Sequence, residues 1–291
     1  MSDFVRIFEM GPRDGLQNEA AQIATADKVA LVDRLSGCGF DHIEVTSFVS
    51  PKWVPQMADA AEVLAGIERR AGVAYTALTP NMRGYEAARG LADEVAIFGS
   101  ASEGFSKANI NCSIAESLAR FRPLVAAARA DGIPVRGYVS CVIACPYDGA
   151  VAPEAVAQVA AELLAMGCYE VSLGDTIGAG TPDTVRAMLA AVLKVVPAGL
   201  LAGHFHDTNG RAVENIEASL DAGLRCFDAA IGGLGGCPYA PGAAGNVDTL
   251  AVARRVEDLG FVTGLDLGRL EEVAVFAQEL VGASTHPTEE L

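Results

Sequence analysis

The feature that most constrains the fold is an alternation of eight β-rich runs with amphipathic helical stretches. The stretches between the runs, such as TADKVALVDRLSGCG and APEAVAQVAAELLAMG, have apolar residues that return at helical spacing. Regular alternation of this kind predicts a parallel sheet, and eight units in 291 residues predict a (β/α)8 barrel. A doubly wound open sheet is the alternative. The eight runs are FVRIFEM from Phe4, HIEVTSF from His42, VAYTAL from Val73, EVAIFG from Glu94, VRGYVSCV from Val135, YEVSLGD from Tyr169, LLAGHFH from Leu200 and CFDAAIGG from Cys226.

The whole chain, residues 1–291, is expected to form one domain with a short frayed tail from about residue 283. An apolar fraction of 51% is enough for a large core, and no low-complexity tract or Pro/Ser-rich linker suggests a boundary. Several helical stretches close on a glycine, as helix C-caps do, and the next β-rich run follows within a few residues. These glycines are Gly37, Gly132, Gly167 and Gly223.

The charge balance excludes several classes of partner. Lysine and arginine number 21 against 37 aspartate and glutamate residues, a formal net charge of −16, so we expect neither nucleic acid nor a membrane surface as a partner. An anionic substrate therefore needs locally placed cations. No apolar run reaches transmembrane length, and the first fifteen residues carry Asp3, Glu9, Arg13 and Asp14 where a secretory signal would need an apolar stretch, so a cytoplasmic location is expected. The seven cysteines include no CxxC pair, as expected of reduced thiols.

In a barrel of this kind, the chemistry lies at the C-terminal ends of the strands and in the loops that follow them. Acidic, amide and imidazole side chains are concentrated at these points of the sequence, so we expect them to meet on one rim. The segments concerned are GPRDGLQNE, TSFVSPKW, SCVIACPYDG, SLGDTIG, HFHD and GGLGGCPYAPGAAGN.

Two of the four histidines lie two residues apart in HFHD. On a strand, His204 and His206 would project from the same side while Phe205 faces the other, which is how a strand presents a pair of metal ligands. Asp14 and Asn246 would complete a mixed site that favours Mg²⁺ or Mn²⁺, with Zn²⁺ or Co²⁺ left open by the ligand types. The alternatives are a hydrogen-bonded histidine pair, a turn aspartate and a helix N-cap asparagine.

Six segments together resemble the 3-hydroxy-3-methylglutaryl-CoA lyase family, which belongs to a superfamily of metal-dependent TIM barrels that includes isopropylmalate and homocitrate synthases. The resemblance runs from Phe4 to about Gly282. It implies a TIM barrel that binds one divalent cation through Asp14, His204, His206 and Asn246. It also implies an acyl-CoA substrate and a retro-Claisen cleavage that yields acetyl-CoA and acetoacetate. The segments are GPRDGLQNE, IEVTSFVSPKWVPQM, RGYVSC, GCYEVSLGDTIGAGTP, HFHDT and GLGGCPYAPGAAGN.

The same resemblance implies roles for individual side chains. Arg13 would stabilise the enolate that forms on the thioester oxygen, and its alternative role is a rim ion pair with Glu44 or Asp175. Those two carboxylates would orient Arg13 or relay a proton. Cys237, in a glycine-rich loop, would cover the substrate and take part in protonating the acetyl-CoA carbanion. The residues assigned to substrate binding are Arg13, Gln17, Ser47, Arg136 and Thr176.

Other functions remain open at this point. The same side chains would serve a lyase for another 3-hydroxyacyl-CoA, such as citramalyl-CoA or a longer branched substrate. A non-catalytic, metal-stabilised barrel that binds acyl-CoA is the alternative outside enzymes, and Arg13 and Cys237 count against it. A homodimer is expected, although no stretch of the sequence identifies its interface.

Overall fold

Eight parallel strands close into a barrel, and their order around the barrel is their order along the chain. The computed structural model describes residues 3–19, 22–235 and 245–283. Each of the eight predicted runs contains one strand, so the (β/α)8 prediction is confirmed and the open sheet is wrong. The strands are β1 (Arg6–Glu9), β2 (His42–Ser47), β3 (Ala74–Leu78), β4 (Glu94–Ser100), β5 (Val135–Ser140), β8 (Glu170–Asp175), β9 (Leu201–Phe205) and β10 (Cys226–Ala229).

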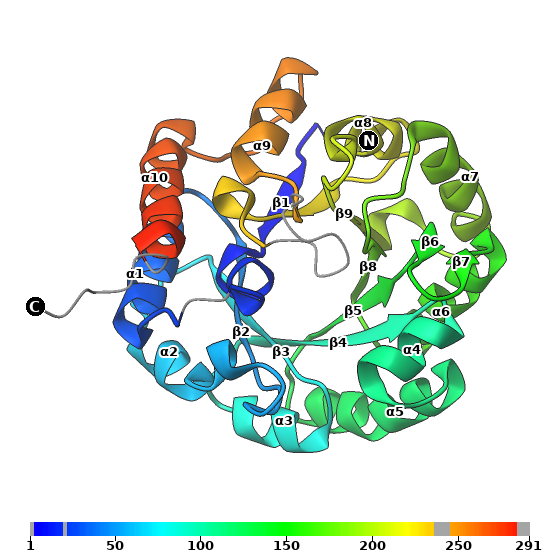
Figure 1. Cartoon of the computed structure of the whole chain (residues 1–291), viewed down its shortest axis with the longest axis horizontal. Coiled ribbons are helices and arrows are strands. Elements are labelled where there is room, and N and C mark those ends of the chain that lie inside the picture. The colour runs from blue at the N-terminus through cyan, green and yellow to red at the C-terminus, as the bar shows by residue number, and fades with distance from the viewer. Residues whose placement is uncertain (1–2, 20–21, 236–244, 284–291) are drawn as a thin grey trace, which may run out of the picture.

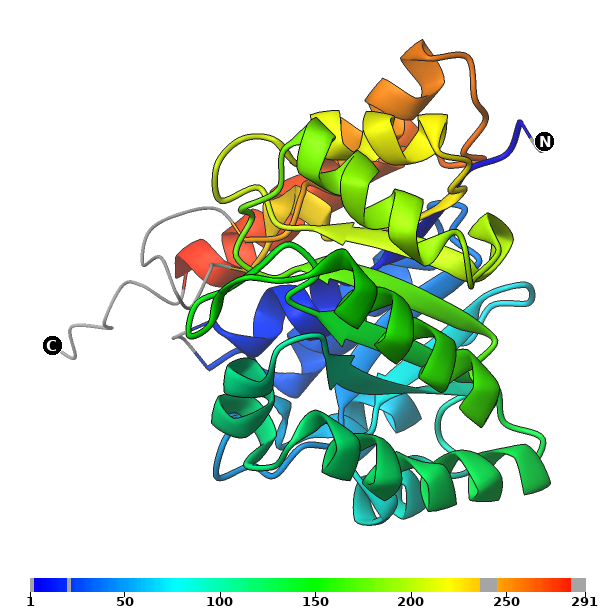
Figure 2. The same cartoon turned by 90° about the vertical axis from the view of Figure 1, so that its right-hand side faces the viewer.

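Helices form a ring outside the strands, as the view down the barrel and the view from the side both show (Figure 1, Figure 2). The helices are α1 (Thr25–Leu35), α2 (Ala60–Gly66), α3 (Met82–Ala88), α4 (Glu103–Ile110), α5 (Ile114–Ala130), α6 (Pro153–Met166), α7 (Pro182–Val192), α8 (Ala212–Asp221), α9 (Thr249–Asp258) and α10 (Leu267–Ala283). Four single turns complete the list: η1 (Gly11–Gly15), η2 (Pro55–Met57), η3 (Ala198–Leu200) and η4 (Ile231–Gly233). Within the described ranges, no helix has the length and apolar character needed to cross a bilayer.

A small hairpin after β5 was not anticipated from the sequence. Its strands are β6 (Ala144–Cys145) and β7 (Gly149–Ala150), which pair antiparallel. The Asp148 carboxylate accepts hydrogen bonds from Ser102 Oγ and the Gly104 amide, both at 2.7 Å. The hairpin is thereby fixed to the start of α4, beside the C-terminal mouth of the barrel.

Side chains alternate along each strand, so one set faces the outer helices and the other faces the interior of the barrel. On β5, Val135 and Val139 face outward into the large apolar layer between strands and helices, whereas Arg136 and Tyr138 face into the barrel. The barrel lumen holds a smaller apolar cluster that includes Phe8, and several buried charges. The apolar shell therefore holds the fold together, while the lumen supports polar side chains beneath the mouth.

Candidate active site

Arg13 and Asp14 lie on η1, a single π-helical turn that follows β1 directly. The turn closes on Met10, whose carbonyl accepts hydrogen bonds from the amides of Asp14 (2.8 Å) and Gly15 (3.2 Å). Beneath it, the buried Glu9 carboxylate accepts the Gly11 amide at 2.7 Å. The turn holds both side chains over the C-terminal end of the barrel, as the sequence predicted for this loop.

Asp14, His204 and His206 form the candidate metal site. Their potential ligand atoms all lie within 4.8 Å of one another, and the two imidazole centroids are 5.4 Å apart. His204 belongs to β9, and His206 lies one residue beyond that strand, where its backbone forms an isolated antiparallel β-bridge with Asn246. The structure thus brings together all four residues predicted as ligands, with Asn246 4% exposed at their side.

The electrostatics of this cluster suit a cation. Burial lowers the pKa of His206 to about 4, helped by His204, so its ring is neutral, as a ligand must be. Burial alone would raise the pKa of Asp14, but Arg13 and the two imidazoles hold it below its usual value. Within the described residues, His206 Nδ1 is buried and has no hydrogen-bond partner. A buried, unpartnered nitrogen beside a carboxylate and a second imidazole fits a divalent metal.

Arg13 is held between two carboxylates. Its Nε donates to Glu44 Oε1 at 2.9 Å, its Nη2 reaches Glu44 Oε2 at 3.3 Å, and its Nη1 donates to Asp14. The side chain is only 8% exposed, and the two carboxylates raise its pKa although burial would lower it. Tyr138 donates a hydrogen bond to the other side of Glu44. The guanidinium is therefore fixed, and of its five N–H groups these carboxylates use three.

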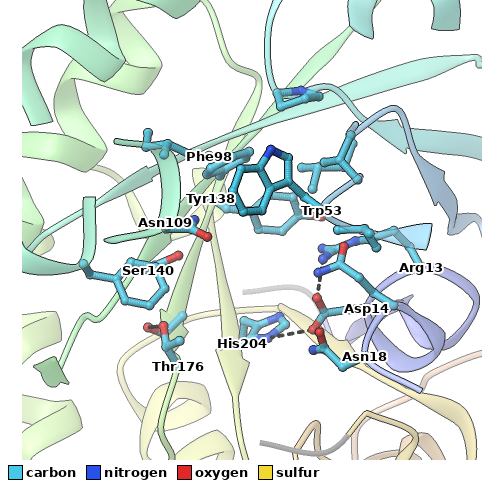
Figure 3. A pocket seen from close by; sticks show the side chains of 18 of the residues that line it. Arg13, Asp14, Asn18, Trp53, Phe98, Asn109, Tyr138, Ser140, Thr176 and His204 are labelled. Carbon is cyan, nitrogen blue, oxygen red and sulfur yellow. Dashed lines mark hydrogen bonds and ion pairs between the residues drawn. The ribbon is translucent and has the colours of Figure 1, made fainter. Parts of the chain in front are cut away.

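The site opens into a cavity of about 560 Å³ at the mouth of the barrel. Arg13, Asp14 and His204 turn toward one another on one side, and Trp53, Phe98 and Asn109 are among the residues that line the rest (Figure 3). The wall combines apolar side chains with a few converging polar groups, which is the usual composition of a small-molecule site.

The family follows from a comparison of the whole chain with known proteins. The HMGL-like family model matches residues 4–276. The chain belongs to the HMGL-like family. A curated relative from Pseudomonas aeruginosa, a 3-hydroxy-3-isohexenylglutaryl-CoA/hydroxy-methylglutaryl-CoA lyase, is 56% identical over 96% of this chain and 94% of its own.

Solved structures of HMGL-like proteins agree with this fold. The HMG-CoA lyase from Brucella melitensis superposes with a TM-score of 0.95 at 63% identity, covering 96% of this chain and 99% of its own. An HMG-CoA lyase from Acinetobacter baumannii, solved with coenzyme A and 3-methylmalate, gives 0.92 at 35% identity over 100% and 98% of the two chains.

Three residues predicted to bind substrate lie near the candidate metal site. Gln17 and Thr176 line the cavity, and Ser47 is fully buried at the end of β2. Gln17 Oε1 and Ser47 Oγ are buried and have no partner among the described residues, but only Gln17 also lines the cavity, where a ligand can reach it. Thr176 accepts a hydrogen bond from the Cys141 amide at 2.9 Å.

Two other predicted residues have different surroundings from those expected. Arg136 is fully buried in the barrel lumen, paired with Glu170 and Asp228, and it is not among the residues that line the cavity. Asp175 is also fully buried, and its two oxygens accept the amides of Ala179 (3.1 Å) and Gly180 (2.7 Å). Arg136 thus lies below the site, and Asp175 holds the loop that carries Thr176. Cys237 lies outside the described residues.

Sequence reasoning missed two side chains next to the site. Asp228 hydrogen-bonds His204, and Tyr138 hydrogen-bonds Glu44. Alternation in CFDA and in RGYVSC is a signal that both face the same side as other polar residues, but it does not reveal their partners. Trp53, 86% exposed at the cavity, lies in the motif SFVSPKWVPQM, which does not itself indicate that this side chain lines the site.

Proposed function

We propose that this chain is a divalent-metal-dependent lyase that cleaves 3-hydroxy-3-methylglutaryl-CoA into acetyl-CoA and acetoacetate. One observation carries the proposal: a fixed Arg13 guanidinium, with N–H groups left over for a ligand, lies directly beside the Asp14, His204 and His206 cluster. The names of the relatives support the acyl group, and the relative solved with coenzyme A supports an acyl-CoA partner.

The reaction separates the substrate between C2 and C3. The C3 hydroxyl loses its proton, the C2–C3 bond breaks, and its electron pair moves onto the thioester as an enolate while C3 becomes the ketone of acetoacetate. Protonation of C2 then gives acetyl-CoA. The chain must therefore help a proton leave, stabilise an enolate oxygen and return a proton.

Asp14, His204, His206 and Asn246 would hold the cation. When bound, Mg²⁺ or Mn²⁺ would supply Lewis acidity that lowers the pKa of the substrate hydroxyl. Gln17 Oε1, which lines the cavity and has no partner in the described structure, would orient the substrate.

Arg13 would donate its remaining N–H groups to the enolate oxygen. Glu44 and Asp14 hold the guanidinium in place before the substrate arrives, so little reorganisation is needed as charge develops. Because both Glu44 oxygens already accept hydrogen bonds, we assign Glu44 to orienting Arg13 rather than to moving a proton. Cys237 would return the proton to C2, and a Cys237→Ser variant is then expected to keep the fold and the metal but lose most of kcat.

The deciding experiment follows acetyl-CoA release from 3-hydroxy-3-methylglutaryl-CoA in Mg²⁺, in Mn²⁺ and in excess EDTA. We expect release with either metal, none in EDTA, and recovery when the metal is restored. Failure with both metals would contradict the proposed substrate, and citramalyl-CoA and longer branched substrates would be assayed next. Failure with every acyl-CoA would favour the non-catalytic binding barrel.

The homodimer and the cytoplasmic location stay predictions. Relatives carry both mitochondrial and cytoplasmic names, so they do not decide the compartment. Sedimentation of the purified full chain would test the dimer.

A further inference from the structure

Beneath the site, Arg136 joins three acceptors from different strands. Its Nε donates to Glu170 Oε1 (2.9 Å), its Nη1 to Tyr138 OH (3.0 Å) and its Nη2 to Asp228 Oδ1 (2.8 Å). The guanidinium also lies 4.1 Å from the centre of the Phe8 ring. Because Arg136 is completely buried, it is fixed in place and has no path to a ligand in the cavity.

The two oxygens of Asp228 have separate partners. Oδ1 faces Arg136, while Oδ2 accepts from Ser172 Oγ (2.7 Å) and faces His204 Nδ1 (3.1 Å). Asp228 on β10 is also the register partner of His204 on β9, so the backbone places the carboxylate beside the ring. Each contact is internal to the barrel, and Asp228 is 2% exposed.

This arrangement decides which nitrogen of His204 carries the proton. A carboxylate between a guanidinium and a hydroxyl donor can only accept, so His204 Nδ1 must be the N–H that faces it. The lone pair of the neutral ring is then on Nε2, which lies 3.7 Å from Asp14 Oδ2 inside the candidate metal cluster. A metal needs that lone pair.

We propose that Asp228, oriented by Arg136, is a positioning residue that fixes the Nδ1–H tautomer of His204 so that Nε2 is ready to bind the metal. The inference rests on the proposed metal site but not on the substrate. It also gives Arg136 a role: the side chain acts on the site through Asp228 and does not touch the substrate.

An Asp228→Asn substitution tests the proposal sharply because Arg136 dictates how the new amide must lie. Arg136 Nη2 only donates, so the amide oxygen must face it, and the amide NH₂ must then face Ser172 and His204. His204 Nδ1 is forced to accept, which moves the ring proton to Nε2. We expect Mn²⁺ and Mg²⁺ to bind about 10- to 100-fold more weakly, the range found when such outer partners are removed.

Two readouts on the full chain separate positioning from general damage. Nitrogen-15 NMR of the four histidines, recorded without metal at alkaline pH where imidazoles are neutral, reports the His204 tautomer directly. Calorimetric titration with Mn²⁺ reports affinity without reference to turnover. We expect Nδ1–H in the wild type, Nε2–H in Asp228→Asn, and a matching loss of Mn²⁺ affinity.

Tyr138→Phe is the matched control. It removes the hydrogen bond that Arg136 donates to the Tyr138 hydroxyl, and with it the one that this hydroxyl donates to Glu44. The Asp228 contact stays in place, so tautomer and Mn²⁺ affinity should stay as in the wild type. An Nε2–H ring in the wild type would overturn the proposal even if the Asn variant did not fold. Wild-type tautomer and affinity in a folded Asp228→Asn protein would overturn it as well. Absent lyase activity with these readouts as expected would refute the substrate alone.

Discussion

The two ends of the barrel both carry partly buried histidines beside carboxylates, but they use them differently. At the N-terminal end, His42 Nδ1 bonds Asp41 at 2.9 Å, its Nε2 lies 3.5 Å from Glu94, and Tyr169 donates to Glu94 at 2.9 Å. At the C-terminal mouth, His206 Nδ1 has no partner within the described structure. One end thus satisfies its polar groups internally, and the other leaves them for a ligand.

The distribution of unpartnered atoms makes the same distinction. Among the residues that the structure describes, every buried side-chain nitrogen or oxygen without a hydrogen bond belongs to the C-terminal face of the barrel. The residues are Gln17, Ser47, His206, Asn215 and Asp248. Of these residues, Gln17 and His206 line the cavity, so two of the unpartnered atoms lie where a ligand can reach them.

The largest effect is expected from breaking the mouth at Arg13. Arg13→Gln removes the cation that faces the developing enolate, and kcat should fall by about 10²- to 10³-fold. Acetyl-CoA release under saturating substrate measures it. Arg6→Gln on β1, the strand that leads into η1, is the control, because Arg6 pairs with Asp41 at the N-terminal end of the barrel and its loss should leave kcat near the wild-type value. Equal losses in both variants would contradict the division between the two ends.

Glu9, just below the mouth, should be a source of instability at neutral pH. Burial raises its pKa to about 7, although Gly11, Ile231 and Thr249 all donate hydrogen bonds to it. A raised carboxyl pKa means that wild-type stability falls as pH rises from about 4.5 to about 7.

Glu9→Gln should remove this pH dependence. Its amide can accept the two backbone amides on one side and donate to the Thr249 hydroxyl on the other. At pH 8 we expect the variant to be more stable than the wild type by on the order of 3 kcal/mol, with the gap closing toward pH 5. Urea unfolding at both pH values is the measurement, and parallel pH profiles would refute the idea.

At the N-terminal end of the barrel, the charge on His42 should stabilise the fold, whereas the charge on Glu9 destabilises it; both effects make stability fall as pH rises. Burial would lower the pKa of His42, but Asp41 and Glu94 raise it to about 9. Its charge therefore stabilises the fold fully below about pH 6.5, and this contribution is lost as pH rises to about 9. His42→Gln should cost about 2 kcal/mol at pH 6 and little at pH 10, measured by urea unfolding. A loss that does not change with pH would point to packing against Phe8 instead.

The smallest effect should come from the outer ring of helices. A substitution there gives the reference against which the effects at both ends of the barrel are compared. Arg122 and Glu162 form an exposed ion pair at 2.7 Å between α5 and α6. Arg122→Gln is expected to change the free energy of unfolding by less than about 0.5 kcal/mol and to leave kcat unaltered. A larger change in thermal unfolding would mean that exposed pairs also contribute to the barrel's stability.

The sequence predicted the fold well because its signal is local and repeated. All eight β-rich runs are strands, and the spacing in HFHD correctly placed His204 and His206 together. The hairpin at 144–150 was missed because its strands have only two residues each, too few for a period to be seen.

Less of the site could be predicted, because partners across a barrel are far apart in the sequence. Arg136 and Asp228 are 92 positions apart, and nothing near either residue indicates the other. Resemblance assigned Arg136 to the substrate and Asp175 to catalysis. Only the three-dimensional surroundings show the first in the lumen and the second bonded to its own loop.

Arg136 and Tyr138 lie two residues apart on β5, so the hydrogen bonds that support the site form only when this strand has the correct register. A slip of β5 by one position would turn Gly137 and Val139 inward and send both polar side chains into the apolar shell. Such a misaligned barrel would lose its hold on Asp228 and Glu44 together. Only molecules with the correct β5 register are therefore expected to turn over substrate. The specific activity after refolding then measures the fraction of molecules in which this strand is correctly aligned.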